Sequence, residues 1–246
     1  MNAETTLDPI PASIDNIEFV MISSSGSAVS AESPTRFRYQ QKGQMIWGAY
    51  IGDTVTIGRF VGRRDGDTVT IHFAHKSVGG GEVTLGTAQS TLRRGDDGRL
   101  YLDETFEKDG VAHVSACVDV PPLEQWPSLD AALVSEPRID GTSFVLESST
   151  ASTVSTTAPT RFDFHENSGV IWGSYYGDTV TGGYCVGRYR DGVIDEYFVH
   201  HVVATDTTLL GDSSTVMKQR DDGRLELIEE FVLDGVPGKS VCVQLP

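Results

Sequence analysis

Glutamate recurs at one position of two β-prone runs where its neighbours on the same face are apolar. Alternate residues of a strand share a face. The two shared faces are Leu100, Leu102, Glu104 and Phe106, and Leu225, Leu227, Glu229 and Phe231. A carboxylate among apolar side chains is costly unless it is hydrogen-bonded or functional. The functional interpretation is a general acid or base; the structural one is a rim position, or a bond to the backbone or to Arg36 or Arg161.

Histidine recurs in the same way at the end of another pair of runs. The shared faces are Val69, Ile71, Phe73 and His75, and Ile194, Glu196, Phe198 and His200. A histidine at the mouth-side end of a strand could be a general base or a ligand contact, or a purely structural residue. If the fold brings His200 near Glu229, and His75 near Glu104, each pair would form an acid–base couple in an apolar pocket. We therefore predict His200 and Glu229 as catalytic residues.

Aromatic side chains provide candidates for binding rather than catalysis. Trp47 and Tyr50 recur as Trp172 and Tyr175, and they could pack a core or form a wall against an apolar or planar ligand. Tyr50 lies on the opposite face from Trp47, so both cannot line one cavity unless a bulge intervenes. The predicted ligand-binding residues are Trp172, Tyr175, Tyr176, Tyr184, Glu196, Phe198, Phe231, Trp47, Phe73, His75 and Glu104.

These residues recur because the chain is one unit written twice. A shift of 125 positions aligns the sequence with itself without a gap, and about 45 of the 105 pairs from position 14 to 118 are identical. We predict a flexible N-terminal lead-in over 1–13, a first repeat over 14–118, a linker over 119–138 and a second repeat over 139–246. Within the linker, the sequence predicts a short helix over 128–133 with Ser128 as its N-cap.

The two repeats differ at positions that bear on a pocket. Where the first repeat has Ile51, Arg59 and Ile71, the second has Tyr176, Tyr184 and Glu196. The second repeat likewise has Gly182, Cys185 and Tyr197 in place of Ile57, Phe60 and His72. Copies that keep a frame and change these side chains could have different pockets, and we favour the second as the site.

Each repeat divides into eight short β-prone runs separated by turn residues such as Lys42-Gly43 and Asp96-Asp97-Gly98. This spacing is typical of an antiparallel meander. Closing the meander removes its exposed edges, so we predict an all-β protein of two tandem eight-stranded antiparallel barrels. The barrels are expected to be related by a pseudo-twofold axis and to pack on each other as a pseudo-dimer. Such an interior can be filled by side chains or hold one small ligand. Two β-sandwiches are the alternative.

One pattern resembles a known family. The pattern is Phe37-x-Tyr39-x-x-x-Gly43-x-x-Ile46-Trp47-x-x-Tyr50-x-Gly52, then Gly58-x-x-Val61-Gly62 and Asp97-Gly98-Arg99-Leu100-x-Leu102-x-Glu104. It resembles small single-unit bacterial proteins that are often labelled N-acetylglutamate synthase, and it covers nearly all of each repeat. The resemblance implies a calycin-like, or lipocalin-like, β-barrel, here duplicated. The label implies an acetyl-CoA-dependent transferase, with a mixed α/β fold and a Gly-rich turn before a helix. The sequence has neither feature, so we do not expect an acetyltransferase.

Composition excludes several classes of partner. The formal net charge of −16 disfavours nucleic acid and anionic membrane surfaces, which both require basic residues. No run approaches the roughly 18 apolar residues of a membrane span. The three cysteines have no CxxC spacing, which indicates neither a disulfide framework nor a zinc site, and a reducing cytoplasm is the simplest location. No nucleophile elbow, Walker loop or dinucleotide fingerprint is present, so we expect no cofactor and no metal.

These observations leave the question of enzymatic activity open. The first hypothesis is a cofactor-independent cyclase or isomerase of specialised, polyketide-type metabolism that folds a small apolar substrate inside a barrel, chiefly through shape and entropy. The second is a non-catalytic carrier or self-protection protein for a small apolar molecule. The third is a structural protein whose two barrels simply pack together. An open cavity containing His200 and Glu229 would favour the enzyme, an apolar cavity the carrier, and filled barrels the structural protein.

Overall fold

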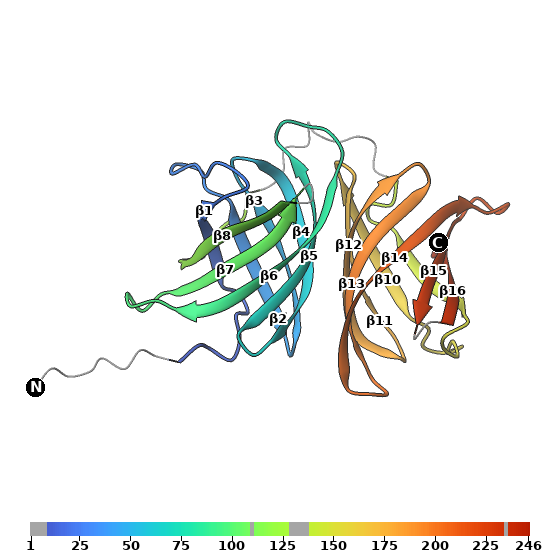
Figure 1. Ribbon diagram of the computed structural model, residues 1–246. Helices are drawn as coiled ribbons and strands as arrows, with labels where there is room; N and C mark the ends of the chain where they lie inside the picture. Colours follow the sequence, from blue (N-terminus) through green and yellow to red (C-terminus); the bar gives the residue numbers. More distant parts are fainter. Residues whose placement is uncertain (1–8, 109–110, 128–137, 234–235) are drawn as a thin grey trace, which may run out of the picture.

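The computed structural model describes residues 9–108, 111–127, 138–233 and 236–246. Its strands form two closed antiparallel barrels that lie side by side (Figure 1). The first closes in the order β1 to β8; the second runs from β10 to β16 and closes through β9. The prediction of two tandem eight-stranded barrels is confirmed, and the sandwich alternative is wrong.

The strands of the two repeats correspond one to one. The first barrel consists of β1 (Glu18–Ser24), β2 (Arg36–Lys42), β3 (Met45–Ile51), β4 (Val55–Asp65), β5 (Thr68–Ser77), β6 (Thr84–Arg94), β7 (Leu100–Lys108) and β8 (Val111–Val120). The second consists of β9 (Ser143–Ser149), β10 (Arg161–Asn167), β11 (Val170–Tyr176), β12 (Val180–Arg190), β13 (Val193–Val202), β14 (Thr207–Gln219), β15 (Leu225–Leu233) and β16 (Val236–Gln244).

Turn residues set the hairpins, as their sequence indicates. Asp191 and Gly192 join β12 to β13 with φ values of 52° and 86°. Both values lie in the left-handed region, which asparagine, aspartate and glycine tolerate and which tight hairpins require. Gly43 and Gly98 adopt the same region in the first repeat, with φ values of 60° and 80°. These short turns fix the register of the strands and therefore which residues face inward.

Each barrel encloses its own apolar core. In the first, the buried side chains include Phe19, Phe37, Tyr39, Phe60 and Leu102. Ile10 packs against this core, and Arg64 donates a hydrogen bond to the Pro11 carbonyl at 2.7 Å, so the described part of the lead-in lies against the first barrel. In the second barrel the buried set includes Phe144, Phe164 and Tyr175. The predicted linker helix over 128–133 lies outside the described residues.

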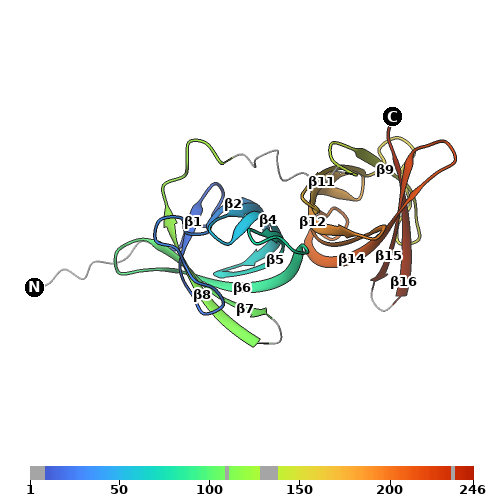
Figure 2. The same ribbon diagram turned by 90° about the horizontal axis from the view of Figure 1, so that it is seen from above.

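A third core joins the two barrels. Outward-facing residues of β4 and β5 meet those of β12 and β13, and these strands lie on the facing sides of the two barrels (Figure 1). Figure 2 shows β12 on the side of the second barrel that is turned toward the first. Trp47 stacks on Tyr184 with ring centroids 3.9 Å apart, and the Arg59 guanidinium lies 4.3 Å from the Trp172 ring centre. Since 59 and 184 are equivalent positions, as are 47 and 172, the contact has approximate twofold symmetry with different chemistry in its two halves.

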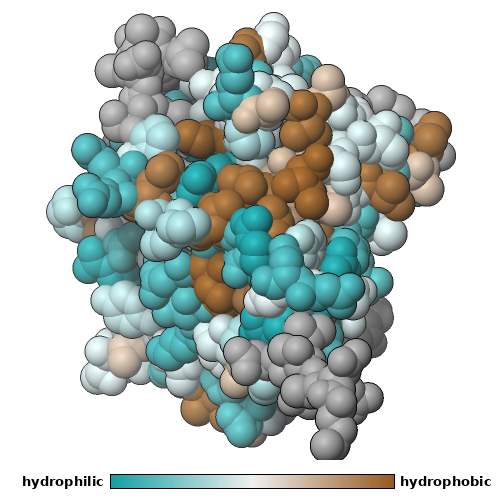
Figure 3. All heavy atoms as spheres, turned by 90° about the vertical axis from the view of Figure 1, so that its left-hand side faces the viewer, coloured by the Kyte–Doolittle hydropathy of each residue, from teal (hydrophilic) through white to brown (hydrophobic). Residues whose placement is uncertain are grey.

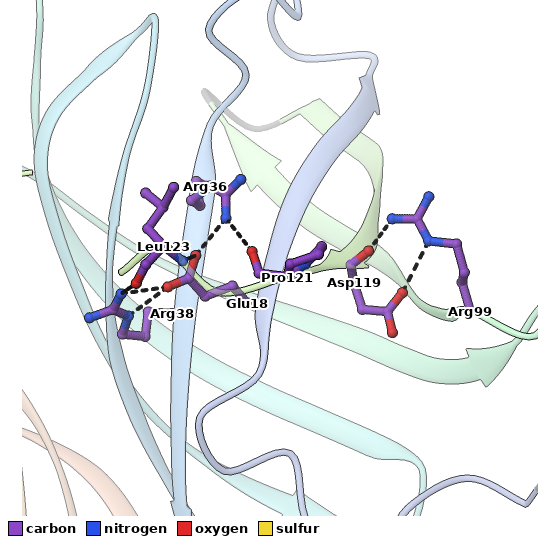
Figure 4. Close-up of polar contacts among 7 residues, drawn as sticks. All are labelled: Glu18, Arg36, Arg38, Arg99, Asp119, Pro121 and Leu123. Atoms are coloured by element: carbon purple, nitrogen blue, oxygen red, sulfur yellow. Dashed lines mark hydrogen bonds and ion pairs between the residues drawn. The ribbon is translucent and has the colours of Figure 1, made fainter. Parts of the chain in front are cut away.

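A buried glutamate holds the start of the linker against the first barrel (Figure 4). Glu18 is 0% exposed and binds Arg36 and Arg38, both with N–O distances of 2.6 Å. It also accepts a hydrogen bond from the Leu123 backbone, and Arg36 donates to the Pro121 carbonyl. Burial alone would raise the pKa of Glu18, but hydrogen bonds from the two arginines outweigh it and lower the pKa.

The outer surface of the first barrel carries apolar residues on the side away from the second barrel (Figure 3). Ile22 of β1 and Val114 of β8 are 49% and 59% exposed. Their counterparts in the second repeat are Glu147 and Lys239. At these two positions the apolar character is specific to the first repeat. Within the described residues, no helix is long and apolar enough to cross a bilayer.

Candidate functional site

The interior of the second barrel contains a polar cluster built by four adjacent strands. Glu196 of β13 pairs across the sheet with Ser213 of β14, and Thr215 of β14 pairs with Glu229 of β15. Thr215 and Ser213 donate hydrogen bonds to Glu196 at 3.3 and 3.5 Å, and the Cys185 thiol of β12 donates to the same carboxylate. Strand alternation turns all five side chains inward at a similar depth.

The two carboxyl groups of this cluster have raised pKa values and can share a proton near neutral pH. Burial, and then repulsion from Glu229, raise the pKa of Glu196 to about 7. Burial likewise raises the pKa of Glu229, against a hydrogen bond from Ser213 that lowers it. Two carboxylates that repel each other titrate as a pair. At neutral pH the cluster can therefore both donate and accept a proton.

The first barrel has a different lining at the same depth. Ile71, Ala88 and Phe60 stand at the positions of Glu196, Ser213 and Cys185. Glu104, the counterpart of Glu229, accepts a hydrogen bond from Ser115 at 2.6 Å, and burial raises its pKa. The first barrel therefore keeps one bonded carboxyl group, where the second has a pair.

Two inward positions are more exposed to solvent in the second barrel than in the first. Glu196 is partly exposed although it faces inward, whereas Ile71 at the equivalent position is 3% exposed. Phe162 is also partly exposed, and its counterpart Phe37 is 8% exposed. The smaller side chain of Cys185 in place of Phe60 is consistent with this difference.

A tyrosine–histidine pair recurs in both interiors. Tyr175 Oη lies 2.9 Å from His200 Nδ1, and Tyr50 Oη lies 2.9 Å from His75 Nδ1. Gly183 makes this possible, since a Cβ there would lie 2.3 Å from the Tyr175 ring. Burial, followed by repulsion from His201, lowers the pKa of His200 to about 4. The imidazole is therefore neutral at neutral pH and is a weak base.

The acid–base couple expected from the sequence has different partners in the structure. His200 bonds to Tyr175, while Glu229 interacts with Ser213 and with Glu196. The arginines considered as structural partners are also engaged elsewhere. Arg36 binds Glu18, and Arg161 binds Asp163 at 3.2 Å. Register is the reason: His200 and Glu229 belong to strands separated by β14, whose Ser213 and Thr215 side chains lie between Glu196 and Glu229 in the sheet.

Comparison with known proteins supplies a family. The avidin-like protein family matches twice, over residues 12–120 and 137–245, so each match covers one barrel. The chain belongs to the avidin-like family. No curated protein matches it.

Solved structures resemble the chain only distantly. Immune modulator A of Aeromonas veronii is 9% identical with a TM-score of 0.33, and the match covers 96% of this chain and 95% of that one. A double mutant of transferrin-binding protein B from Haemophilus parasuis is 6% identical with a TM-score of 0.30, over 90% of this chain and 68% of that one.

Four predicted ligand contacts lie outside the interiors of the two barrels. Trp47, Trp172 and Tyr184 face outward and form the contact between the barrels, so they cannot line either interior. The strand pleat explains this: Tyr50 and Tyr175 point inward, and residues three positions earlier point outward. Tyr176 also points outward and is 56% exposed.

The other predicted contacts face inward. Phe198 stacks on His200 and Phe73 on His75, with ring centroids 5.3 and 5.6 Å apart. Phe231 lies over Gly238. These two residues line a hollow at the mouth of the second barrel together with Thr150, Glu230, Pro237 and Lys239. The aromatic residues of the second barrel thus lie between its mouth and the carboxyl pair.

Sequence reasoning missed the hydroxyl and thiol members of the cluster. Ser213, Thr215 and Cys185 were not predicted as site residues, although a signal existed. Ser213 and Thr215 alternate with Met217 on one face of β14, and Ser213 replaces Ala88 of the first repeat. Reading all inward differences between the repeats together would have identified the cluster. Among the described residues, no group of three or more His, Cys, Asp or Glu side chains is arranged to hold a metal ion.

Proposed function

We propose that this protein binds one small molecule, mainly apolar, inside its second barrel. One observation carries the proposal: three inward apolar side chains of the first barrel, Phe60, Ile71 and Ala88, are replaced together by Cys185, Glu196 and Ser213. These changes convert a filled apolar region into a partly accessible one that contains ionisable groups. A concave, aromatic-lined interior with a few convergent polar groups is the usual form of a small-molecule site. Eight-stranded barrels are wide enough for one such ligand.

The first barrel has a supporting role in this proposal. Its equivalent positions are filled by Phe60, Tyr39 and Ile71, all of them nearly inaccessible to solvent. It contributes the partner surface for the outer faces of β12 and β13 through the shared third core. A rigid support of this kind keeps a binding site in shape.

The test compares the native protein with a variant whose second barrel is filled like the first. Protein isolated from its own host is analysed by native mass spectrometry, and any bound molecule is released by denaturation and identified. We expect one bound molecule per chain, and its loss in Cys185→Phe. The control is Glu104→Gln, a change inside the first barrel that should leave binding intact. A molecule that stays bound in Cys185→Phe would place the site elsewhere and refute the proposal.

A second candidate function is a cofactor-independent cyclase or isomerase acting on the same ligand. The observation that favours it is the pKa of about 7 for Glu196, since a general acid or base works best when its pKa lies near the operating pH. In this function Glu196 and Glu229 would exchange protons with the substrate, and His200 would hold it by a hydrogen bond. Glu196→Gln, which keeps the shape, should then lose turnover even at ligand concentrations that saturate the site. A ligand recovered unchanged after incubation with the native protein would leave only the binding function.

A further inference from the structure

We propose that the ligand of the second barrel is a compact organic cation, a ring-bearing amine or amidine. Its charge would be balanced by Glu196 and Glu229, and its ring would take the space that the Phe60 ring fills in the first barrel. This inference rests on the proposed function and names the chemical class of its ligand.

The first argument is the charge of the interior. Among the described residues, the groups that act on Glu196 and Glu229 are hydroxyls, a thiol and each other, and none of them is cationic. Arg188 of the neighbouring strand faces outward and binds Asp195 at 3.2 Å. Buried carboxylates normally have a cationic partner or a metal ion. A ligand cation would supply the missing charge, and it would draw both carboxyl groups into their ionised form.

The second argument is the shape of the interior, for which the first barrel is an internal comparison. Phe60 is fully buried, 4.7 Å from the Tyr39 ring and 6.3 Å from the Tyr50 ring, measured between centroids. Its ring lies over Gly48, where a Cβ would be only 2.4 Å away. The second barrel keeps the glycine, as Gly173, but replaces the phenyl ring by the thiol of Cys185. A Cβ at Gly173 would lie 3.2 Å from both the Cys185 thiol and the Phe164 ring, against 2.4 Å from Phe60 at Gly48, so side chains crowd this position less closely in the second barrel.

The third argument is the surrounding aromatic wall. Phe162 and Tyr175 stack with centroids 4.9 Å apart, and Phe198 stacks on His200. Aromatic faces attract organic cations and also bury their apolar parts. A bare metal ion would gain nothing from this wall and would need more oxygen ligands than the pair provides. The net charge of −16 adds a long-range attraction for any cation.

The experiment uses benzamidinium, a planar ring cation, and benzamide, its neutral counterpart of the same shape. Calorimetric titration of the full chain should show one benzamidinium bound, and benzamide bound at least about tenfold more weakly. Benzamidinium affinity should rise about tenfold between pH 5.5 and 8, because ionising the pair costs less at higher pH. Titration at pH 6.5 in two buffers of different ionisation enthalpy should show protons released on binding.

Variants separate this inference from the proposed function. Glu196→Gln, which preserves shape, should weaken benzamidinium binding by about 30-fold or more. Glu104→Gln, which makes the same change in the first barrel at the counterpart of Glu229, should leave binding unchanged. Equal binding of benzamide and benzamidinium, both blocked by Cys185→Phe, would refute the cation and uphold a small-molecule site. If neither probe binds, the proposal of a cationic ligand is refuted. The proposed binding function is then tested separately, by whether a bound molecule is recovered from the native protein.

Discussion

The two barrels have the same strands and the same turns, yet their interiors differ in chemistry. At one depth, the first presents Phe60 and Ile71, and the second presents Cys185 and Glu196. The first fills this depth with buried apolar side chains, whereas the second has two carboxyl groups there, both partly exposed. A duplicated frame therefore supports two different interiors, because the register of a closed sheet does not depend on which inward side chains fill it.

The repeats also differ at their outer surfaces. The linker start is clamped to the first barrel by Glu18, whereas the counterpart Ser143 donates a hydrogen bond to Asp163 at 2.5 Å. At the contact between the barrels, one half is an aromatic stack and the other a guanidinium over an indole. The comparison thus extends from the cores to the interface, and each difference can be tested with a matched pair of variants.

The largest expected effect on the free energy of unfolding comes from a change in core packing. Phe60→Cys should lower the free energy of unfolding by about 4 kcal/mol, since it removes a fully buried ring and leaves a cavity. Cys185→Phe, the reverse change in the second barrel, should cost far less because the retained Gly173 leaves room. Chemical denaturation of both variants measures the difference. Equal destabilisation by the two would mean that the second barrel is as tightly filled as the first.

Removal of the Glu18 carboxylate should have the second-largest effect on stability. Glu18→Gln should destabilise the protein by about 3 kcal/mol, because it leaves Arg36 and Arg38 without their buried carboxylate. The lowered pKa of Glu18 means that this stability is present above its unfolded pKa and is lost as the pH falls through the folded value. Ser143→Ala is the matched change in the second repeat and should have a small effect. If the unfolding curves of Glu18→Gln and the native protein coincide at pH 7, Glu18 does not stabilise the fold in this way.

The carboxyl pair should make stability depend on pH in the opposite direction. The folded pKa of Glu196 is about 7, against an ordinary value of 4.5, so the native state binds more protons between these values. Unfolding free energy should therefore fall by about 2 kcal/mol as the pH rises through this window, after allowing for partial solvent access. Glu196→Gln should flatten the profile above pH 5. A native profile already flat from pH 5 to 8 would show that the folded protein does not raise the pKa of Glu196.

Variants at the contact between the two barrels should change stability least. Arg59→Met, which keeps the apolar stem, should cost about 1 kcal/mol through loss of the cation–π contact with Trp172. Tyr184→Leu at the equivalent position should cost about 1 kcal/mol through loss of the stack on Trp47. Thermal unfolding in low and high salt tells the halves apart, because only the Arg59 contact is electrostatic. The same salt response in both variants would contradict this assignment.

The architecture could be predicted from the sequence because its signals are local. The duplication is visible as identity at a fixed offset, and strand alternation with turn residues indicated an antiparallel meander. Alternation also placed Glu104, Glu196 and Glu229 on inward faces. It could equally have placed Trp47 and Trp172 outside, since it set them on the opposite face from Tyr50 and Tyr175. The prediction of both as ligand contacts instead assumed that aromatic residues retained in both repeats form a pocket wall.

The partners of the inward residues could not be predicted, because they belong to strands distant in sequence. Glu196 meets Glu229 only because β14 pairs with β13 on one side and β15 on the other, with a register that sets Ser213 and Thr215 between them. Tyr175 reaches His200 only because Gly183 of the intervening strand has no side chain. Such contacts depend on closure of the sheet, which no local pattern encodes.

The sequence by itself therefore determined the duplication, the all-β class and which side chains share a face of each strand, since period-two patterning and turn chemistry are properties of short segments. The tertiary structure decided which inward groups meet, which barrel is partly open and which aromatics join the barrels. These outcomes depend on register and on packing across the closed sheet, where a one-residue shift would exchange the inner and outer faces of a strand.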